Sequence, residues 1–113
     1  MQTVVETPEY LKDAKKAGLS DEEHREIIDY MANHPDAGDA IRGTGGARKV
    51  RFAAKGIGKS GGVRVITFYS GVEIPVFLLN LFAKNEKIDL SAAERKMLKN
   101  VLSELVEIYT GRN

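Results

Sequence analysis

Residues 48–69 have the sequence RKVRFAAKGIGKSGGVRVITFY, in which two apolar segments with interspersed basic residues are joined by a loop rich in glycine and lysine. Side chains alternate between the two faces of an extended strand. In the first segment Val50 and Phe52 therefore share one face, and Lys49 and Arg51 share the other. This pattern predicts a strand with one apolar face and one cationic face.

The second segment, residues 63–69, is predicted to be the next strand, with Arg64 on the same face as Ile66 and Phe68. An arginine among apolar neighbours is tolerated at the end of a strand. It is also tolerated on a concave surface where a bound anion compensates the partly desolvated guanidinium. The sequence leaves these two positions open, and the second makes Arg64 a candidate binding residue.

Positive charge is concentrated in residues 42–64, which contain seven Lys or Arg and no Asp or Glu. The rest of the chain has ten Lys or Arg against sixteen Asp or Glu, so the net charge of +1 hides a strongly cationic segment. Such a segment is typical of proteins that bind a polyanion, most often nucleic acid. The alternative is a solvated basic loop that binds no ligand. The seven residues are Arg42, Arg48, Lys49, Arg51, Lys55, Lys59 and Arg64.

The length of 113 residues predicts a single domain with one small core. The composition, 42% hydrophobic and 29% charged, is typical of a soluble globular protein. No apolar run approaches the roughly 20 residues that a membrane helix needs, and the first residues lack the layout of a signal peptide. The chain has no cysteine, which excludes disulfides and thiolate metal sites. We therefore expect a cytoplasmic protein with no membrane partner.

Two helices are predicted before the basic segment. Thr7 and Pro8 are typical of a helix start and Gly18 of a helix end, while residues 20–23 form a capping box for a helix that ends near Asn33. Residues 2–6 are predicted to be a brief edge strand, and residues 36–46 a loop with a short extended piece at residues 40–41. His24 and His34 are interpreted as a packing residue and a helix-end residue rather than as catalytic bases.

The chain after the basic strands is predicted to form a turn, a strand and a helix. Residues 70–71 suit a tight hairpin turn, and residues 73–82 suit a central strand with Pro75 at its start or in a bulge. A second capping box at residues 91–94 begins a long helix that packs on the sheet. Its apolar stripe comprises Met97, Leu98, Val101, Leu102, Leu105, Ile108 and Tyr109.

Nucleotide hydrolysis is not supported by the glycine motifs. Residues 56–61 match G-x-G-x-x-G and residues 58–60 resemble the end of a P-loop, but both motifs need a following helix and a β-rich run follows here. The basic strands also lack the converging carboxylates of a magnesium site. Phosphodiester cleavage by this chain would therefore use no metal. It would suit RNA, whose 2′-OH can attack the adjacent phosphate while Arg and Lys stabilise the developing charge.

The blocks GTGGARKVRFAAKGIGKSGGVRVITFY and AKNEKIDLSAAE, separated by an apolar strand, resemble the HigB branch of the RelE-like toxins of bacterial type II toxin-antitoxin modules. The resemblance covers residues 38–98 and depends on the order of the blocks. It implies an α+β fold with a small antiparallel sheet, an N-terminal helical pair and a C-terminal helix packed on the sheet. It also implies a ribosome-dependent mRNA endoribonuclease that inhibits translation. The implied partners are the 70S ribosome, mRNA and a cognate HigA-like antitoxin, with no cofactor.

The resemblance also implies roles for individual residues. The implied catalytic residues are Arg51, Arg64 and Lys84. The implied RNA-binding residues are Arg48, Lys49, Lys55, Lys59 and Asn85, with no metal ligand. The general base has no secure equivalent, since Tyr109 lies in a helical stripe. Two other functions fit the charge pattern: a non-catalytic nucleic-acid-binding module that uses the basic face of residues 48–64, and a domain that binds an acidic protein.

Overall fold

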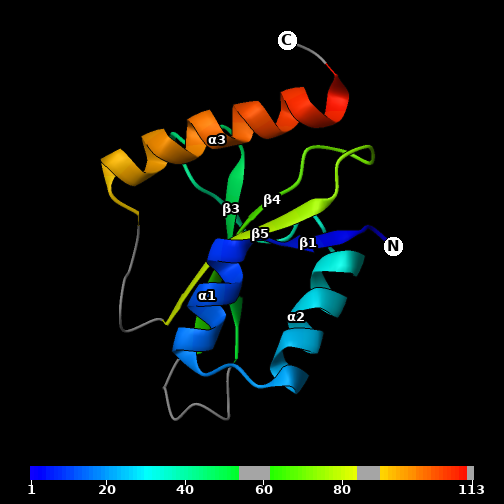
Figure 1. The fold of residues 1–113 in the computed structure, drawn as a ribbon, viewed down its shortest axis with the longest axis vertical. Coiled ribbons are helices and arrows are strands. Elements are labelled where there is room, and N and C mark those ends of the chain that lie inside the picture. The colour runs from blue at the N-terminus through cyan, green and yellow to red at the C-terminus, as the bar shows by residue number, and fades with distance from the viewer. Residues whose placement is uncertain (54–61, 84–89, 112–113) are drawn as a thin grey trace.

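The computed structural model describes residues 1–53, 62–83 and 90–111. Five strands form one mixed sheet in the order β1-β5-β4-β3-β2. Helices α1 and α2 lie on one side of the sheet and α3 lies on the other (Figure 1). In chain order the elements are β1 (Val4–Glu6), α1 (Pro8–Ala17), α2 (Asp21–Asn33), β2 (Asp39–Ala40), β3 (Ala47–Phe52), β4 (Val63–Phe68), β5 (Val76–Ala83) and α3 (Ala92–Thr110). The predicted α+β class and its helical arrangement are confirmed.

The predicted edge strand is β1, but it pairs in parallel with β5, whereas the other strand pairs are antiparallel. Thr7 lies where this strand pairing ends. Its amide and hydroxyl both donate to the carbonyl of Leu78, and its hydroxyl accepts from the amide of Tyr10 at 3.3 Å. One residue therefore ends β1 against β5 and begins α1, so the chain can pass from strand to helix without a loop.

The predicted capping residues at the starts of α2 and α3 and at the end of α1 are confirmed. Ser20 and Glu23 satisfy each other's amides at the start of α2, and Ser91 and Glu94 do the same at the start of α3. Gly18 ends α1 in the left-handed conformation with φ 77°, which glycine adopts without steric cost.

The sheet separates two apolar clusters, because alternate residues of its central strands point to opposite sides. On one side Val50, Val63 and Val65 pack with α1 and α2, and Phe52 packs against this cluster. On the other side Ile66 and Phe68 belong to a cluster with Leu102 of α3. The predicted apolar face of residues 50 and 52 is confirmed.

Several strand boundaries differ from the prediction. β4 ends at Phe68 and β5 begins at Val76, so the predicted tight hairpin at residues 70–71 is wrong. A turn closed by the Ile74 amide and the Gly71 carbonyl lies there instead, and Pro75 directly precedes β5. The short extended piece is β2, one residue earlier than predicted.

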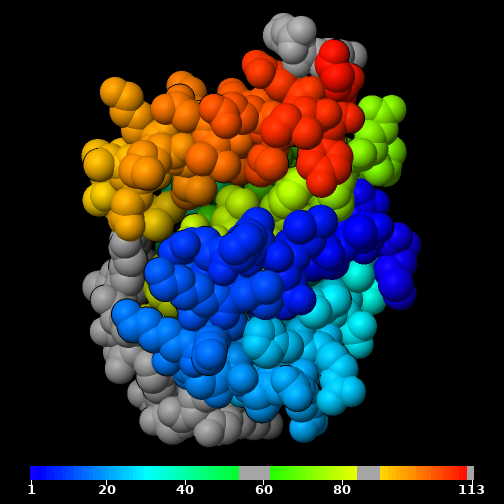
Figure 2. Space-filling view, in the orientation of Figure 1, coloured from blue at the N-terminus to red at the C-terminus, as the bar shows by residue number. Residues whose placement is uncertain are grey.

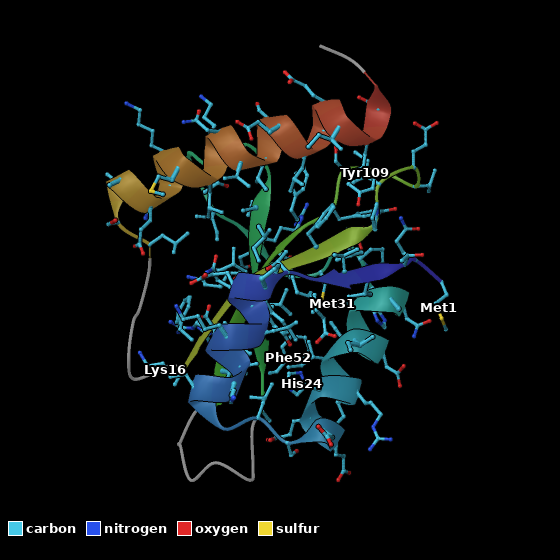
Figure 3. All side chains as sticks on the ribbon, in the orientation of Figure 1. Met1, Lys16, His24, Met31, Phe52 and Tyr109 are labelled. Atoms are coloured by element: carbon cyan, nitrogen blue, oxygen red, sulfur yellow. The ribbon has the colours of Figure 1, made fainter. Side chains whose placement is uncertain are left out.

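Helix α3 packs on the sheet as predicted, but its apolar stripe is only partly covered. Leu102 is the one buried residue of this fully described helix, while Met97 and Ile108 have exposed fractions of 68% and 72%. Figure 3 shows Tyr109 on the α3 side of the sheet, and His24, Met31 and Phe52 on the other. Within residues 1–53, 62–83 and 90–111, no helix is long and apolar enough to cross a membrane.

Candidate nucleic-acid interface

The antiparallel register of β3 and β4 places Arg51 directly opposite Arg64. Directly paired residues of neighbouring strands share a face, with Cβ atoms about 5 Å apart. Lys49 pairs with Ile66 and therefore lies on this face as well. We call Lys49, Arg51 and Arg64 the cationic face. The sequence predicted that these side chains share a direction on their own strands, and the register brings them together.

Strand β5 extends this arrangement. Phe82 is the direct partner of Arg64, and Asn80 is the direct partner of Ile66. Two rows therefore cross the sheet, one formed by Arg51, Arg64 and Phe82 and the other by Lys49, Ile66 and Asn80. The register shifts between Ile66, which pairs with Asn80, and Thr67, which pairs with Leu78, so Leu79 forms a bulge on β5.

Arg64 is buried, with an exposed fraction of only 6%, in a strand whose residues are all buried. It is the second residue of β4, which agrees with the first of the two alternatives, a location near the end of the strand. Arg51 is exposed and Lys49 is partly buried. The sequences of β3, β4 and β5 contain no Asp or Glu. Like charges on directly opposite residues repel, which makes Arg51 and Arg64 a candidate pair for binding an anion.

The remaining predicted site residues are not all part of this face. Arg48 pairs with Thr67 and therefore points to the opposite side of the sheet, and its Nη1 donates to the carbonyl of Gly38 at 3.1 Å. Four predicted residues lie outside the part of the chain that the structure describes: Lys55, Lys59, Lys84 and Asn85.

Two basic residues of α3 were missed by the sequence analysis. A Cβ atom placed on Gly45 would lie 3.6 Å from Cγ of Lys99, and one on Gly43 would lie 4.0 Å from Cδ of Arg95. These side chains therefore border the loop before β3, on the side of the sheet that carries the cationic face. Their i, i+4 spacing places both on one face of the helix, which is the sequence signal that could have identified them.

The histidines lie on the other side of the sheet. His24 Nδ1 lies 3.5 Å from a carboxylate oxygen of Glu6, and its ring meets the ring of Tyr10 edge to face. Burial and, secondarily, the charge of Glu6 raise the pKa of the Tyr10 phenol. His34 caps α2 and stacks on Tyr30. The interpretation of both histidines as structural residues agrees with these contacts.

Tyr109 lies at the far end of the α3 side, where its ring meets Phe77 edge to face with ring centroids 5.4 Å apart. Phe77 pairs with Phe68, four residues along β4 from Arg64. Tyr109 is therefore not adjacent to the paired arginines. Across the described part of the chain, no three His, Cys, Asp or Glu side chains form a group that could hold a metal ion.

A comparison with protein families agrees with this architecture. The family model described as "RelE toxin of RelE / RelB toxin-antitoxin system" matches residues 2–111. The match includes every helix and strand of the structure, from β1 to α3. The sheet with an N-terminal helical pair, the C-terminal helix and the cationic face are thus all contained in the matched segment. The chain belongs to the RelE toxin family of toxin-antitoxin systems.

Proposed function

We propose that this toxin is a HigB-like, ribosome-dependent mRNA endoribonuclease that inhibits translation. Membership of the RelE family supports the toxin role, and the cationic face supports a phosphodiester substrate. The single observation that carries the proposal is the direct pairing of a buried and an exposed arginine on strands without carboxylates.

In the proposed reaction the 2′-OH of the mRNA loses its proton and its oxygen forms a bond to the adjacent phosphorus. The bond from phosphorus to the 5′-oxygen breaks, and protonation of that oxygen leaves a 2′,3′-cyclic phosphate and a 5′-OH. Negative charge develops on the phosphoryl oxygens and on the leaving oxygen. Arg64 stabilises this charge, because its guanidinium is held by a buried strand and needs little reorganisation. Arg51 and Lys49, which are more accessible, bind the phosphate of the incoming strand.

Residues assigned by the family resemblance complete the proposed site. Lys84 is the third proposed catalytic residue, and Arg48, Lys55, Lys59 and Asn85 are proposed to contact mRNA or ribosomal RNA. The proposed partners are mRNA, the 70S ribosome and a HigA-like antitoxin in the cytoplasm. Residues 1–113 are proposed to act as one toxin domain, with no cofactor.

Arg64→Ala tests the proposal, with Arg25→Ala as the control. Arg25 is an exposed arginine of α2, on the other side of the sheet, and has no proposed role in the site. Wild type and Arg25→Ala should arrest growth on induction and produce new 5′ ends within translated mRNA. Loss of a preorganised donor should lower the cleavage rate of Arg64→Ala on the order of 10² to 10³. Far-ultraviolet circular dichroism verifies folding.

The same experiment separates catalysis from binding alone. If wild type leaves mRNA intact, and single alanine substitutions weaken RNA binding gradually, the protein is a non-catalytic nucleic-acid-binding module. Each lost phosphate contact on a single strand should then lower the salt slope of binding by about 0.7. A folded Arg64→Ala protein that cleaves at the wild-type rate would remove Arg64 from the site.

A further inference from the structure

The loop before β3 is held in one conformation by a buried threonine. Residues 42–46 have the sequence RGTGG, and we call them the RGTGG loop. Thr44 is fully buried, and its hydroxyl donates to the Ile41 carbonyl at 2.7 Å and accepts from the Ala47 amide at 3.0 Å. The Ile41 amide donates to the Ala47 carbonyl, which closes the base of the loop. The loop is therefore a preformed feature at the start of β3.

Two glycines of the RGTGG loop present backbone at the surface. Gly43 and Gly45 are exposed and have φ of 83° and 78°, which glycine adopts without steric cost. Neither amide forms a hydrogen bond with another residue in the described part of the chain. Gly46 has a packing role instead, because a Cβ atom there would lie 3.2 Å from the Phe68 ring. Exposed N–H groups in a turn suit a phosphate oxygen.

Basic side chains reach the RGTGG loop from two elements that are distant in sequence. Arg42 belongs to the loop itself and is exposed. Lys99, also exposed, and Arg95 extend from α3 past Gly45 and Gly43, which have no side chains to cover them. Three cationic side chains are thus gathered around a preformed turn. This arrangement favours the binding of an anion.

Strand β3 connects the RGTGG loop with the paired arginines. Ala47 begins β3 and Arg51 lies four residues further on, so about 13 Å separate them at about 3.3 Å per residue. Lys49 lies halfway and shares a side of the sheet with Arg51. Asp39 of β2 pairs with Lys49 and adds a carboxylate beside this path. Cationic groups follow one another along β3 at intervals of about 7 Å, which one nucleotide of an extended strand can span.

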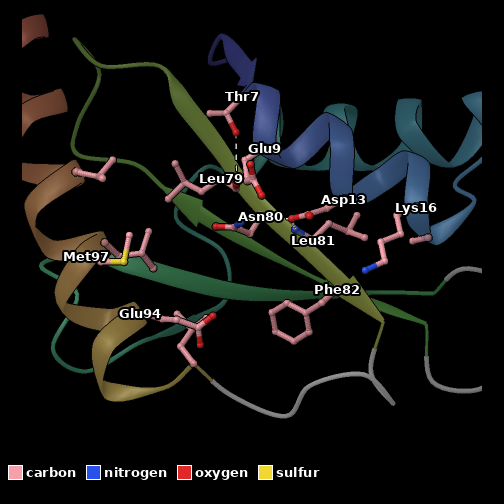
Figure 4. Close-up of a pocket in the computed structure, with 14 residues that line it drawn as sticks. Thr7, Glu9, Asp13, Lys16, Leu79, Asn80, Leu81, Phe82, Glu94 and Met97 are labelled. Atoms are coloured by element: carbon pink, nitrogen blue, oxygen red, sulfur yellow. Dashed lines mark hydrogen bonds between the residues drawn. The ribbon is translucent and has the colours of Figure 1, made fainter.

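A strand that leaves Arg64 in the other direction meets an acidic groove. This groove, of about 780 Å³, lies between α1 and α3 with β5 as its floor (Figure 2), and Phe82, the direct partner of Arg64, lines it. Three carboxylates and one ammonium are found among its described lining residues (Figure 4): Glu9, Asp13, Glu94 and Lys16. Carboxylates repel a phosphate backbone, so the charge distribution directs RNA along β3 instead.

We propose that the RGTGG loop, with Arg42 and Lys99, binds a backbone phosphate of the RNA strand whose scissile phosphate lies at Arg64. The spacing along β3 puts the two phosphates roughly two nucleotides apart. Backbone N–H groups and the cationic side chains supply charge-assisted hydrogen bonds. The position of the scissile phosphate rests on the proposed function, whereas phosphate binding at the loop does not. Because one phosphate cannot occupy both places, short RNA fragments should bind much more weakly than longer ones.

The length dependence of RNA binding tests this proposal. Oligouridylates with 2′-O-methyl groups cannot be cleaved through the 2′-oxygen, so fluorescence anisotropy measures their affinity without catalysis. Wild-type protein should bind a hexanucleotide far more tightly than a dinucleotide, because only the longer strand reaches from Arg64 to the loop.

Lys99→Ala is compared with Lys96→Ala as the matched control. Both lysines are exposed on α3, but of the two only Lys99 lies within 4 Å of a Cβ atom at Gly45. Lys99→Ala should weaken binding of the hexanucleotide several-fold at low salt and lower its salt slope by about 0.7. The advantage of the hexanucleotide over the dinucleotide should shrink accordingly. Lys96→Ala should bind both as wild type does.

Nuclear magnetic resonance locates the contact directly. The amide signals of Gly43 and Gly45 should shift when the hexanucleotide is added to isotope-labelled wild-type protein. Gly71 is the internal control, since it is also an exposed glycine with positive φ but lies in the turn before β5. Equal shifts at all three glycines would indicate non-specific binding and count against the proposal.

Two further outcomes would overturn the proposal. The first is equal hexanucleotide affinity of Lys99→Ala and Lys96→Ala. The second is unchanged hexanucleotide affinity of Lys99→Ala together with weaker binding to 70S ribosomes, which would assign the phosphate to ribosomal RNA. Arg51→Ala separates this test from the proposed function. If Lys99→Ala weakens hexanucleotide binding and Arg51→Ala does not, the loop site stands and the cationic face fails.

Discussion

Arg51 and Arg64 are direct cross-strand partners, one exposed and the other buried in the central strand of the sheet. Like charges in this relationship destabilise a sheet. A pair of arginines that costs stability has a purpose if both bind the same anion. Substitutions in this pair should therefore change both stability and RNA binding.

Replacing Arg51 by threonine should stabilise the protein while weakening RNA binding. Threonine suits a strand and removes the repulsion with Arg64, so the free energy of unfolding should rise by a few tenths to about 1 kcal/mol. Urea denaturation at low salt measures this gain, which should shrink at 1 M salt because of screening. A less stable Arg51→Thr protein would contradict repulsion between the two guanidinium groups.

The basic residues that α3 contributes should support RNA binding. The double variant Arg95→Ala, Lys99→Ala should lower the salt slope of binding to a single-stranded RNA by up to about 1.4, which corresponds to two contacts. Filter binding at several salt concentrations measures the slope. Lys12→Ala and Lys15→Ala, which alter exposed lysines of α1, serve together as the control. An unchanged slope in the α3 variant would restrict the interface to the sheet.

Gly62→Ala should destabilise the protein more than Gly71→Ala. Both glycines have positive φ, 73° and 108°, so both substitutions introduce backbone strain. A Cβ atom at Gly62 would also collide with the backbone carbonyl of Phe52, whereas nothing lies within 4 Å of one at Gly71. We expect a loss of about 1 kcal/mol for Gly71→Ala and several-fold more for Gly62→Ala. Similar losses in thermal denaturation would show that β3 can move away from this site.

Tyr10→Phe should keep or raise stability at neutral pH. The Tyr10 side chain is fully buried, and its hydroxyl has no hydrogen-bond partner among the described residues. Removing an unsatisfied hydroxyl relieves a penalty of about 1 kcal/mol. Guanidinium denaturation at pH 7 measures the change. A loss of more than about 1 kcal/mol would reveal a hydrogen bond to the hydroxyl.

The same substitution should alter the alkaline limit of stability. The folded state raises the pKa of Tyr10, while the unfolded chain loses this proton near pH 10. Above about pH 10 the folded state therefore holds one proton more, and stability falls as pH rises, by up to about 1.4 kcal/mol per pH unit. Tyr10→Phe should reduce this slope between pH 10 and 11. Equal slopes would mean that Tyr10 ionises alike in both states.

Local chemistry explains which parts of the fold could be predicted. The capping boxes at Ser20 and Ser91 and the proline before β5 act within a few residues, so the sequence reveals them directly. Alternation likewise assigned Lys49 and Arg51 to one face. The parallel pairing of β1 and the β5 bulge depend on contacts between residues about 70 positions apart or on register, which no local pattern encodes.

In the candidate site, too, local features could be predicted from the sequence and long-range contacts could not. The concentration of basic residues was evident from the sequence, but the pairing of Arg51 with Arg64 required the register of β3 and β4. The opposite direction of Arg48 follows from simple alternation once Lys49 and Arg51 are assigned to one face. Arg95 and Lys99 were missed because only the packing of α3, which lies far along the chain, brings them beside the loop before β3.

Strand β4 is buried along its whole length between the two helical layers. Its amides should therefore exchange hydrogen with solvent only when both layers open, which amounts to global unfolding. Arg64 is mounted on this strand, so the base of its side chain keeps its position for as long as the molecule stays folded. The timescale on which the backbone beneath the proposed catalytic group can be displaced is then set by the unfolding rate of the toxin, rather than by loop motion.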